Sequence, residues 1–112
     1  MHPDMAYHTA LAAGRWFELT LAEQLGNVGS EVGRMGNWKD KNQEFYLKAF
    51  ERALELLDLT IADLRWKKGL KELTRARELL CDAMQGGKEY GTTFEDLNRY
   101  FFQFALAARQ NK

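Results

Sequence analysis

Residues 43–63, QEFYLKAFERALELLDLTIAD, form the clearest helical pattern in the chain. At about 100° per residue, the apolar side chains gather on one face of a helix and the charged ones on the opposite face. The apolar face holds Tyr46, Ala49, Phe50, Ala53, Leu54, Leu57 and Ile61, and the charged face holds Glu44, Lys48, Glu51, Glu55 and Asp58. Two charge pairs have i,i+4 spacing: Glu44 with Lys48 is attractive, and Glu51 with Glu55 is repulsive. Because these pairs offset each other, the helix is predicted from burial of its apolar face and not from charge pairing.

Three further segments have the same periodicity. A first helix is expected over residues 5–35, where Gly14 either kinks it or separates a short extra N-terminal helix. A third helix is expected over residues 70–85. A fourth begins near Thr92 or Thr93, either of which is a suitable cap, and Thr92 has the spacing of a capping box.

Four amphipathic helices joined by short connections predict an all-α fold, an antiparallel up-down four-helix bundle. With 112 residues the chain has room for one core, so we expect a single domain over residues 1–112. The one proline, Pro3, lies outside every predicted helix, as long helices require.

Charge and cysteine content argue against several classes of protein. Sixteen basic and sixteen acidic side chains leave no net charge, whereas a dedicated nucleic-acid binder usually carries a basic surplus. The single cysteine, Cys81, cannot form an intrachain disulfide and gives no sign of an oxidising compartment. No apolar run approaches the roughly 20 residues of a membrane span, and the N-terminal residues lack a signal-peptide pattern. We therefore expect a cytoplasmic protein without a membrane partner.

The residue types that catalysis needs are scarce. The two histidines, His2 and His8, lie near the N-terminus, and neither follows a glutamate at the Glu-x-x-His spacing of metal sites in helical bundles. Two histidines and one cysteine argue against a zinc site. No glycine-rich loop of the Walker or Rossmann type occurs. We therefore expect no enzyme, no metal and no cofactor.

Glycines form a stripe on the first predicted helix. Gly26, Gly29 and Gly33 fall within about 40° of one another. Each glycine inside a helix costs about 1 kcal/mol relative to alanine, so something is expected to pack against the bare backbone. One interpretation is another helix of the same bundle, and the other is a subunit contact or a ligand groove.

Apolar side chains also occur beyond the predicted core stripes. Phe102 and Leu106 are i,i+4 neighbours on a second face of the fourth helix. Phe45, Leu56 and Leu59 widen the apolar surface of the second helix in the same way. Large apolar patches usually mark interfaces, which predicts a homo-oligomer or another protein partner. The alternative is that the N-terminal segment covers these positions.

A basic turn surrounds a tryptophan between the second and third helices. Arg65, Lys67, Lys68 and Lys71 flank Trp66, and such a cluster can hold phosphate while the indole stacks on a base. The structural interpretation is a solvated turn whose tryptophan lies under the end of the bundle. The zero net charge favours this second interpretation, although nucleic acid stays a possible partner.

Arg77 lies at the edge of the apolar stripe of the third helix. A guanidinium is rarely buried alone, so we predict an ion pair across the bundle. Glu31 and Glu55 are the expected partners.

Residues 27–34 (NVGSEVGR), followed by 44–45 (EF) and 53–54 (AL), resemble a known family. Its members are the small four-helix-bundle proteins encoded in intervening sequences of bacterial large-subunit ribosomal RNA genes, and their relatives include accessory proteins of diversity-generating retroelements. The positions that fit the family pattern Asn-Ile-Ala-Glu-Gly-x-Gly-Arg directly are Asn27, Val28, Gly33 and Arg34. Ser30 and Glu31 stand where the family has its glutamate and next glycine, and the match covers about a third of the chain. The resemblance implies a bundle that assembles as a ring, often a pentamer, with a nucleic-acid or protein partner and no known catalysis.

Two functional hypotheses follow. The first is a non-enzymatic, self-associating helical-bundle protein that acts as an adaptor or accessory subunit. The alternative is a nucleic-acid-binding accessory protein that uses the basic turn around Trp66.

Overall fold

The computed structural model describes residues 14–110, and within this range it is helical and contains no strand. The prediction of an all-α fold is therefore confirmed. In chain order the elements are η1 (Arg15–Glu18), α2 (Leu21–Trp38), α3 (Gln43–Ala62), η2 (Leu64–Gly69), α4 (Leu70–Met84) and α5 (Phe94–Gln110). The η elements are short 3₁₀ helices, and the α elements are four long helices.

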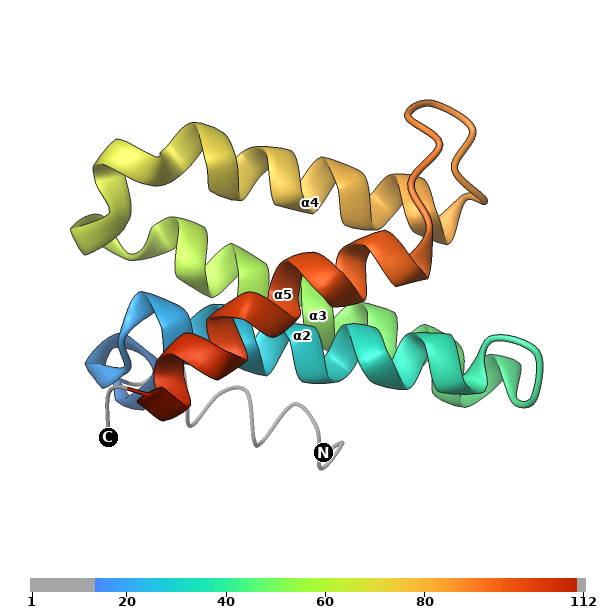
Figure 1. Ribbon diagram of the computed structural model, residues 1–112, viewed down its shortest axis with the longest axis horizontal. Helices are drawn as coiled ribbons and strands as arrows, with labels where there is room; N and C mark the ends of the chain where they lie inside the picture. Colours follow the sequence, from blue (N-terminus) through green and yellow to red (C-terminus); the bar gives the residue numbers. More distant parts are fainter. Residues whose placement is uncertain (1–13, 111–112) are drawn as a thin grey trace.

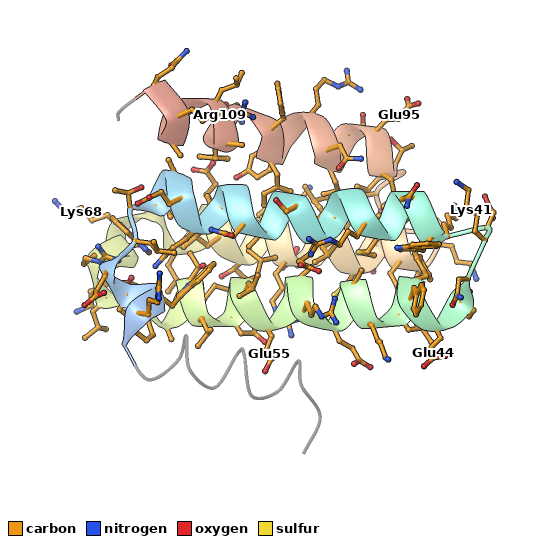
Figure 2. The ribbon with its side chains drawn as sticks, turned by 90° about the horizontal axis from the view of Figure 1, so that it is seen from below. Lys41, Glu44, Glu55, Lys68, Glu95 and Arg109 are labelled. Carbon is orange, nitrogen blue, oxygen red and sulfur yellow. The ribbon has the colours of Figure 1, made fainter. Side chains whose placement is uncertain are left out.

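Helix α2 lies between α3 and α5 and packs closely against both (Figure 2). Helix α4 packs on α3 and more loosely on α5. Figure 1 shows α4 on the far side of α3 from the N-terminal end of α2, and α5 crossing in front of α2 and α3. The arrangement makes α2 the one helix that shares a long interface with two neighbours.

The hydrophobic core draws on all four long helices and on η1. Its buried apolar side chains are Trp16, Leu25, Val28, Val32, Met35, Tyr46, Ala49, Ala53, Leu56, Leu57, Leu73, Ala76, Leu80, Ala83, Leu97 and Phe101. Most of them stand on the stripes that the periodicity predicts. Leu70 stands on the same apolar stripe of α4 as Leu73 and Leu80, but it is the first residue of the helix and remains exposed.

The first helix begins later than predicted. Gly14 has a positive φ of 139°, η1 follows it, and the chain is extended at Leu19 and Thr20 before α2 begins. Thr20 caps α2 through a complete capping box: its hydroxyl accepts from the Glu23 amide at 3.1 Å, and the Glu23 carboxylate accepts from the Thr20 amide at 2.9 Å. One continuous helix through residues 14–20 is therefore wrong, and residues 5–13 lie outside the described range.

Helix α5 begins with a reciprocal cap one residue later than the capping-box spacing predicts. The Asp96 amide donates to the Thr93 hydroxyl at 3.1 Å, and the Thr93 amide donates to the Asp96 carboxylate at 3.3 Å. Thr93 is therefore the capping residue. Thr92 instead donates its amide to Asp82.

Asp82 anchors the loop between α4 and α5. Its buried carboxylate accepts hydrogen bonds from the amides of Glu89, Tyr90 and Thr92 at 2.8–3.1 Å. Burial alone would raise the pKa of Asp82, but these hydrogen bonds outweigh it and lower the pKa. Gly87 permits the tight path of the loop, since its φ is 75° and a Cβ there would lie 2.9 Å from the Thr92 carbonyl oxygen. This loop sets where α5 begins.

Candidate functional site

A groove of about 770 Å³ runs between α2 and α5, and we call it the α2–α5 groove. Helix α2 contributes backbone and small side chains to it, and α5 contributes longer ones. The lining residues from α2 are Gly26, Gly29, Ser30 and Gly33, and those from α5 include Glu95, Asn98, Arg99, Phe102, Ala105 and Arg109. The groove thus contains the predicted glycine stripe and one of the two predicted apolar residues of α5.

Two of the three glycines serve the contact between α2 and α5. A Cβ on Gly29 would lie 2.7 Å from the Phe101 Cβ, and a Cβ on Gly26 would lie 3.2 Å from the Ala105 Cα. Both distances are shorter than ordinary contact, so glycine is what lets α5 approach so closely. At Gly33 a Cβ would meet nothing closer than Asn98 Oδ1 at 3.8 Å. The interpretation as packing within the bundle therefore fits Gly26 and Gly29, while Gly33 is open to the groove.

We expect alanine to have opposite effects at Gly29 and Gly33. At Gly29 overpacking costs about 1–3 kcal/mol, which exceeds the gain of up to about 1 kcal/mol in helix propensity. At Gly33 only the propensity gain applies, so Gly33→Ala should leave the stability unchanged or raise it by up to about 1 kcal/mol. Urea unfolding of both variants at one protein concentration measures the difference, and equal effects would show that the close contact is not real.

The outer side of α5 is apolar at its centre and charged at its ends. The side chain of Phe102 is 54% exposed and that of Leu106 is 40% exposed. Arg99 is paired with Asp96 at 3.3 Å. Glu95 and Arg109, which come from opposite ends of α5, have no ion-pair partner among residues 14–110 (Figure 2). The groove is therefore lined by an exposed aromatic ring and by two charges that have no ion-pair partner among the described residues.

The apolar residues predicted on α3 do not join this surface. Leu56 is only 4% exposed and belongs to the core, so its predicted place at an interface is wrong. The reason is that the buried face of α3 is wider than the single apolar stripe and includes Leu56. Leu59 is half-buried against the core. Phe45 is 44% exposed, but its ring packs edge-on against Trp38 with 5.0 Å between centroids. Helix α3 also lies on the side of α2 away from α5 (Figure 2).

The basic turn around Trp66 is partly occupied by contacts within the chain. Arg65 donates to the Asp63 carboxylate at 2.6 Å and to the Leu19 carbonyl at 2.7 Å, and its guanidinium lies 4.4 Å from the Trp66 ring centroid. The indole nitrogen of Trp66 donates to Gln24 at 2.8 Å. Both side chains thus join η2 to residues 19–24, where α2 begins, as the structural interpretation of the turn expects. Lys67, Lys68 and Lys71 are exposed, and so is Arg65 despite its contacts.

A buried polar cluster, which the sequence patterns do not predict, explains this arrangement. The Gln24 amide nitrogen donates to the Trp16 carbonyl at 2.9 Å and to Asp63 at 3.1 Å. Trp16 in turn donates its indole N–H to the Thr60 hydroxyl at 3.3 Å. Hydrogen bonds from Arg65 are the main cause that lowers the pKa of Asp63 to about 2, with burial opposing and Gln24 adding to the effect. The cluster fastens η1 and η2 to α2 and α3.

Arg77 pairs with a carboxylate that the sequence analysis did not name. Its Nε donates to Asp58 Oδ1 at 2.8 Å, so the predicted partners Glu31 and Glu55 are wrong. Asp58 belongs to the charged face of α3, and α4 packs near enough to that face for Arg77 to reach it. Glu31 instead pairs with Arg34 on its own helix.

The described part of the chain contains neither a metal-binding cluster nor a membrane-spanning helix. Within residues 14–110 no three side chains of the His, Cys, Asp and Glu types stand close enough together to hold a metal ion. None of the helices in this range is both long and apolar enough to cross a membrane. His2 and His8 lie outside the described residues.

Comparison with known proteins gives no match. No family model, no curated protein and no solved structure is significantly similar to the chain. The resemblance of residues 27–34 to the ribosomal intervening-sequence proteins therefore stays a prediction.

Proposed function

We propose that the protein is a non-enzymatic adaptor or accessory subunit that self-associates through the outer face of α5. The observation that carries this proposal is the exposure of Phe102 beside the α2–α5 groove. Within residues 14–110 Phe102 stays more than half exposed. Aromatic residues at the centre of a surface patch are typical anchors of protein interfaces.

We also infer an antiparallel up-down four-helix bundle as the scaffold. The alternating course of α2, α3, α4 and α5 in Figure 1 supports this topology. So does the four-residue connection between Trp38 and Gln43, which is short enough to favour antiparallel neighbours. With a single, partly buried cysteine, a cytoplasmic location remains part of the same proposal.

The nucleic-acid alternative has less support. Arg65 and Trp66 contact Asp63 and Gln24. The remaining lysines of the turn have no cation–π contact with an aromatic ring within residues 14–110. The Arg65 guanidinium lies over the Trp66 ring, so a base would have to displace it or stack on the other face of a half-buried indole. Nucleic acid that co-elutes with the purified protein would favour this alternative.

Phe102→Glu tests the proposed surface. A carboxylate at the centre of the interface would be buried without a partner, so the complex should weaken roughly 30-fold or more and the mass should fall to that of the monomer. Leu64→Glu is the matched control, because Leu64 is 82% exposed on η2, away from the groove. Light scattering measures the masses and circular dichroism the helicity. A Phe102→Glu protein that keeps the wild-type multimeric mass would refute the role of this face.

A further inference from the structure

A stripe of three residues seven positions apart runs along the exposed face of α5. Glu95, Phe102 and Arg109 are two turns apart in succession, and this spacing places them on one side of a helix. All three line the α2–α5 groove. The stripe therefore reads acidic, aromatic and basic from the beginning of α5 to its end.

The two charges are symmetric about the aromatic ring. Glu95 is seven residues before Phe102 and Arg109 is seven residues after it, which is about 10 Å in each direction along the helix. Both are exposed, and neither has an ion-pair partner among the described residues. Such a surface is complementary to a copy of itself that is turned by 180° about Phe102.

We propose that a second copy of the chain docks on this stripe, with its α5 antiparallel to the first and the two-fold axis at Phe102. In this arrangement Glu95 faces the partner subunit's Arg109, and Arg109 faces the partner subunit's Glu95. The two Phe102 rings meet at the axis, and Leu106 lies opposite the partner subunit's Asn98. The inference rests on the self-association proposed above and specifies its geometry.

Electrostatics favours this arrangement over the other ways in which two copies can meet. A parallel pair of α5 helices would place Glu95 opposite Glu95 and Arg109 opposite Arg109, so both ends would repel. A ring is built from two different patches on each subunit, and it makes no use of a patch that is complementary to itself. A two-fold contact forms a dimer and stops there, and in it both Glu95 and Arg109 of each chain gain an ion-pair partner.

Charge reversal at either end of the stripe tests the register. Glu95→Arg leaves two basic ends, and Arg109→Glu leaves two acidic ends, so each variant alone should dissociate roughly 4- to 30-fold more readily than the wild type. The two single variants, when mixed, should form a heterodimer, because each supplies the charges that the other lacks. The double variant Glu95→Arg/Arg109→Glu should regain the dimer. The exposed loop substitution Glu89→Arg is the control and should leave the mass unchanged.

Glu95 lies in the first turn of α5 and Arg109 in the last, where each charge interacts favourably with the helix dipole. The double variant reverses both charges, so its α5 helix is expected to be less stable. Circular dichroism of every variant separates this effect from assembly, and the heterodimer of the two single variants does not depend on it. Masses are measured by light scattering at low salt, where the charges are least screened.

The outcomes distinguish this inference from the function on which it rests. A wild-type monomer would overturn both. A wild-type multimer that loses its mass with Phe102→Glu but keeps it in Glu95→Arg and Arg109→Glu would overturn the antiparallel register and leave self-association through α5 intact. Single variants that dissociate but form no heterodimer on mixing would also overturn the register. Recovery of the dimer on mixing would support it.

Discussion

Phe101→Ala is expected to lower the free energy of unfolding by about 3–5 kcal/mol, the largest effect of any single substitution in α5. Phe101 is fully buried, and its Cβ stands over Gly29 at the closest approach of α5 to α2. Its ring also packs edge-on against Tyr100 at 5.1 Å between centroids. Truncation of Phe101 would leave a cavity between α2 and α5. The two helices already lie in close contact at Gly29, so they cannot move together to fill that cavity.

The neighbouring residue is the matched control for this prediction. Phe102 is the same residue type on the same helix, but it faces solvent. Phe102→Ala should leave the stability of the monomer within about 0.5 kcal/mol of the wild type. Urea unfolding at a concentration that keeps both proteins monomeric measures the two values, and comparable losses at Phe101 and Phe102 would contradict the orientation of α5.

Gln24→Ala is expected to have the second largest effect, a loss of about 3–5 kcal/mol. Gln24 is fully buried and makes three hydrogen bonds, to Trp16, Asp63 and Trp66. Its removal opens a cavity and leaves buried polar groups unpaired, and each such group costs about 1–3 kcal/mol. Near-ultraviolet circular dichroism should also change, since two tryptophans lose their fixed surroundings.

Gln103→Ala is the control, because Gln103 is exposed on α5 and its side chain makes no hydrogen bond within the described residues. The free energy of unfolding of the Gln103→Ala variant should stay within about 0.5 kcal/mol of the wild-type value. If Gln24→Ala behaved in the same way, η1 and η2 would not be held by the polar cluster.

The helices and their buried faces could be predicted from the sequence because they depend on periodicity. Residues 43–63 have a strong stripe, and α3 begins at Gln43 and ends within one residue of the prediction. Gly14 is the predicted point at which the first helical segment kinks or divides, whereas α2 begins only at Leu21, after η1. The Thr20-x-x-Glu23 capping box was the local signal that marks the true start.

The contacts that organise the ends of the bundle could not be predicted in this way. Gln24 is polar and lies beside the apolar stripe of its helix, so only the approach of Trp16, Asp63 and Trp66 in the fold gives it a buried role. The assignment of Leu56 to a surface failed for a related reason: α3 is buried over a wider arc than a single stripe.

The candidate site was partly visible in the sequence. The glycine stripe and Phe102 were identified, but no pattern on either helix shows that they face one another across a groove. The charges at Glu95 and Arg109 were not singled out, although their seven-residue spacing from Phe102 is a signal that the sequence contains.

The measurement that tests self-association through α5 most directly is the absolute mass of the wild-type protein in solution. Light scattering over a range of concentrations, with the ultraviolet absorbance spectrum recorded across the peak, gives the mass and detects any bound nucleic acid. We predict a discrete dimer, with twice the chain mass of 13.0 kDa and the absorbance spectrum of protein alone. A mass of 13.0 kDa at every concentration would contradict the account, and co-eluting nucleic acid would favour the basic turn around Trp66 instead.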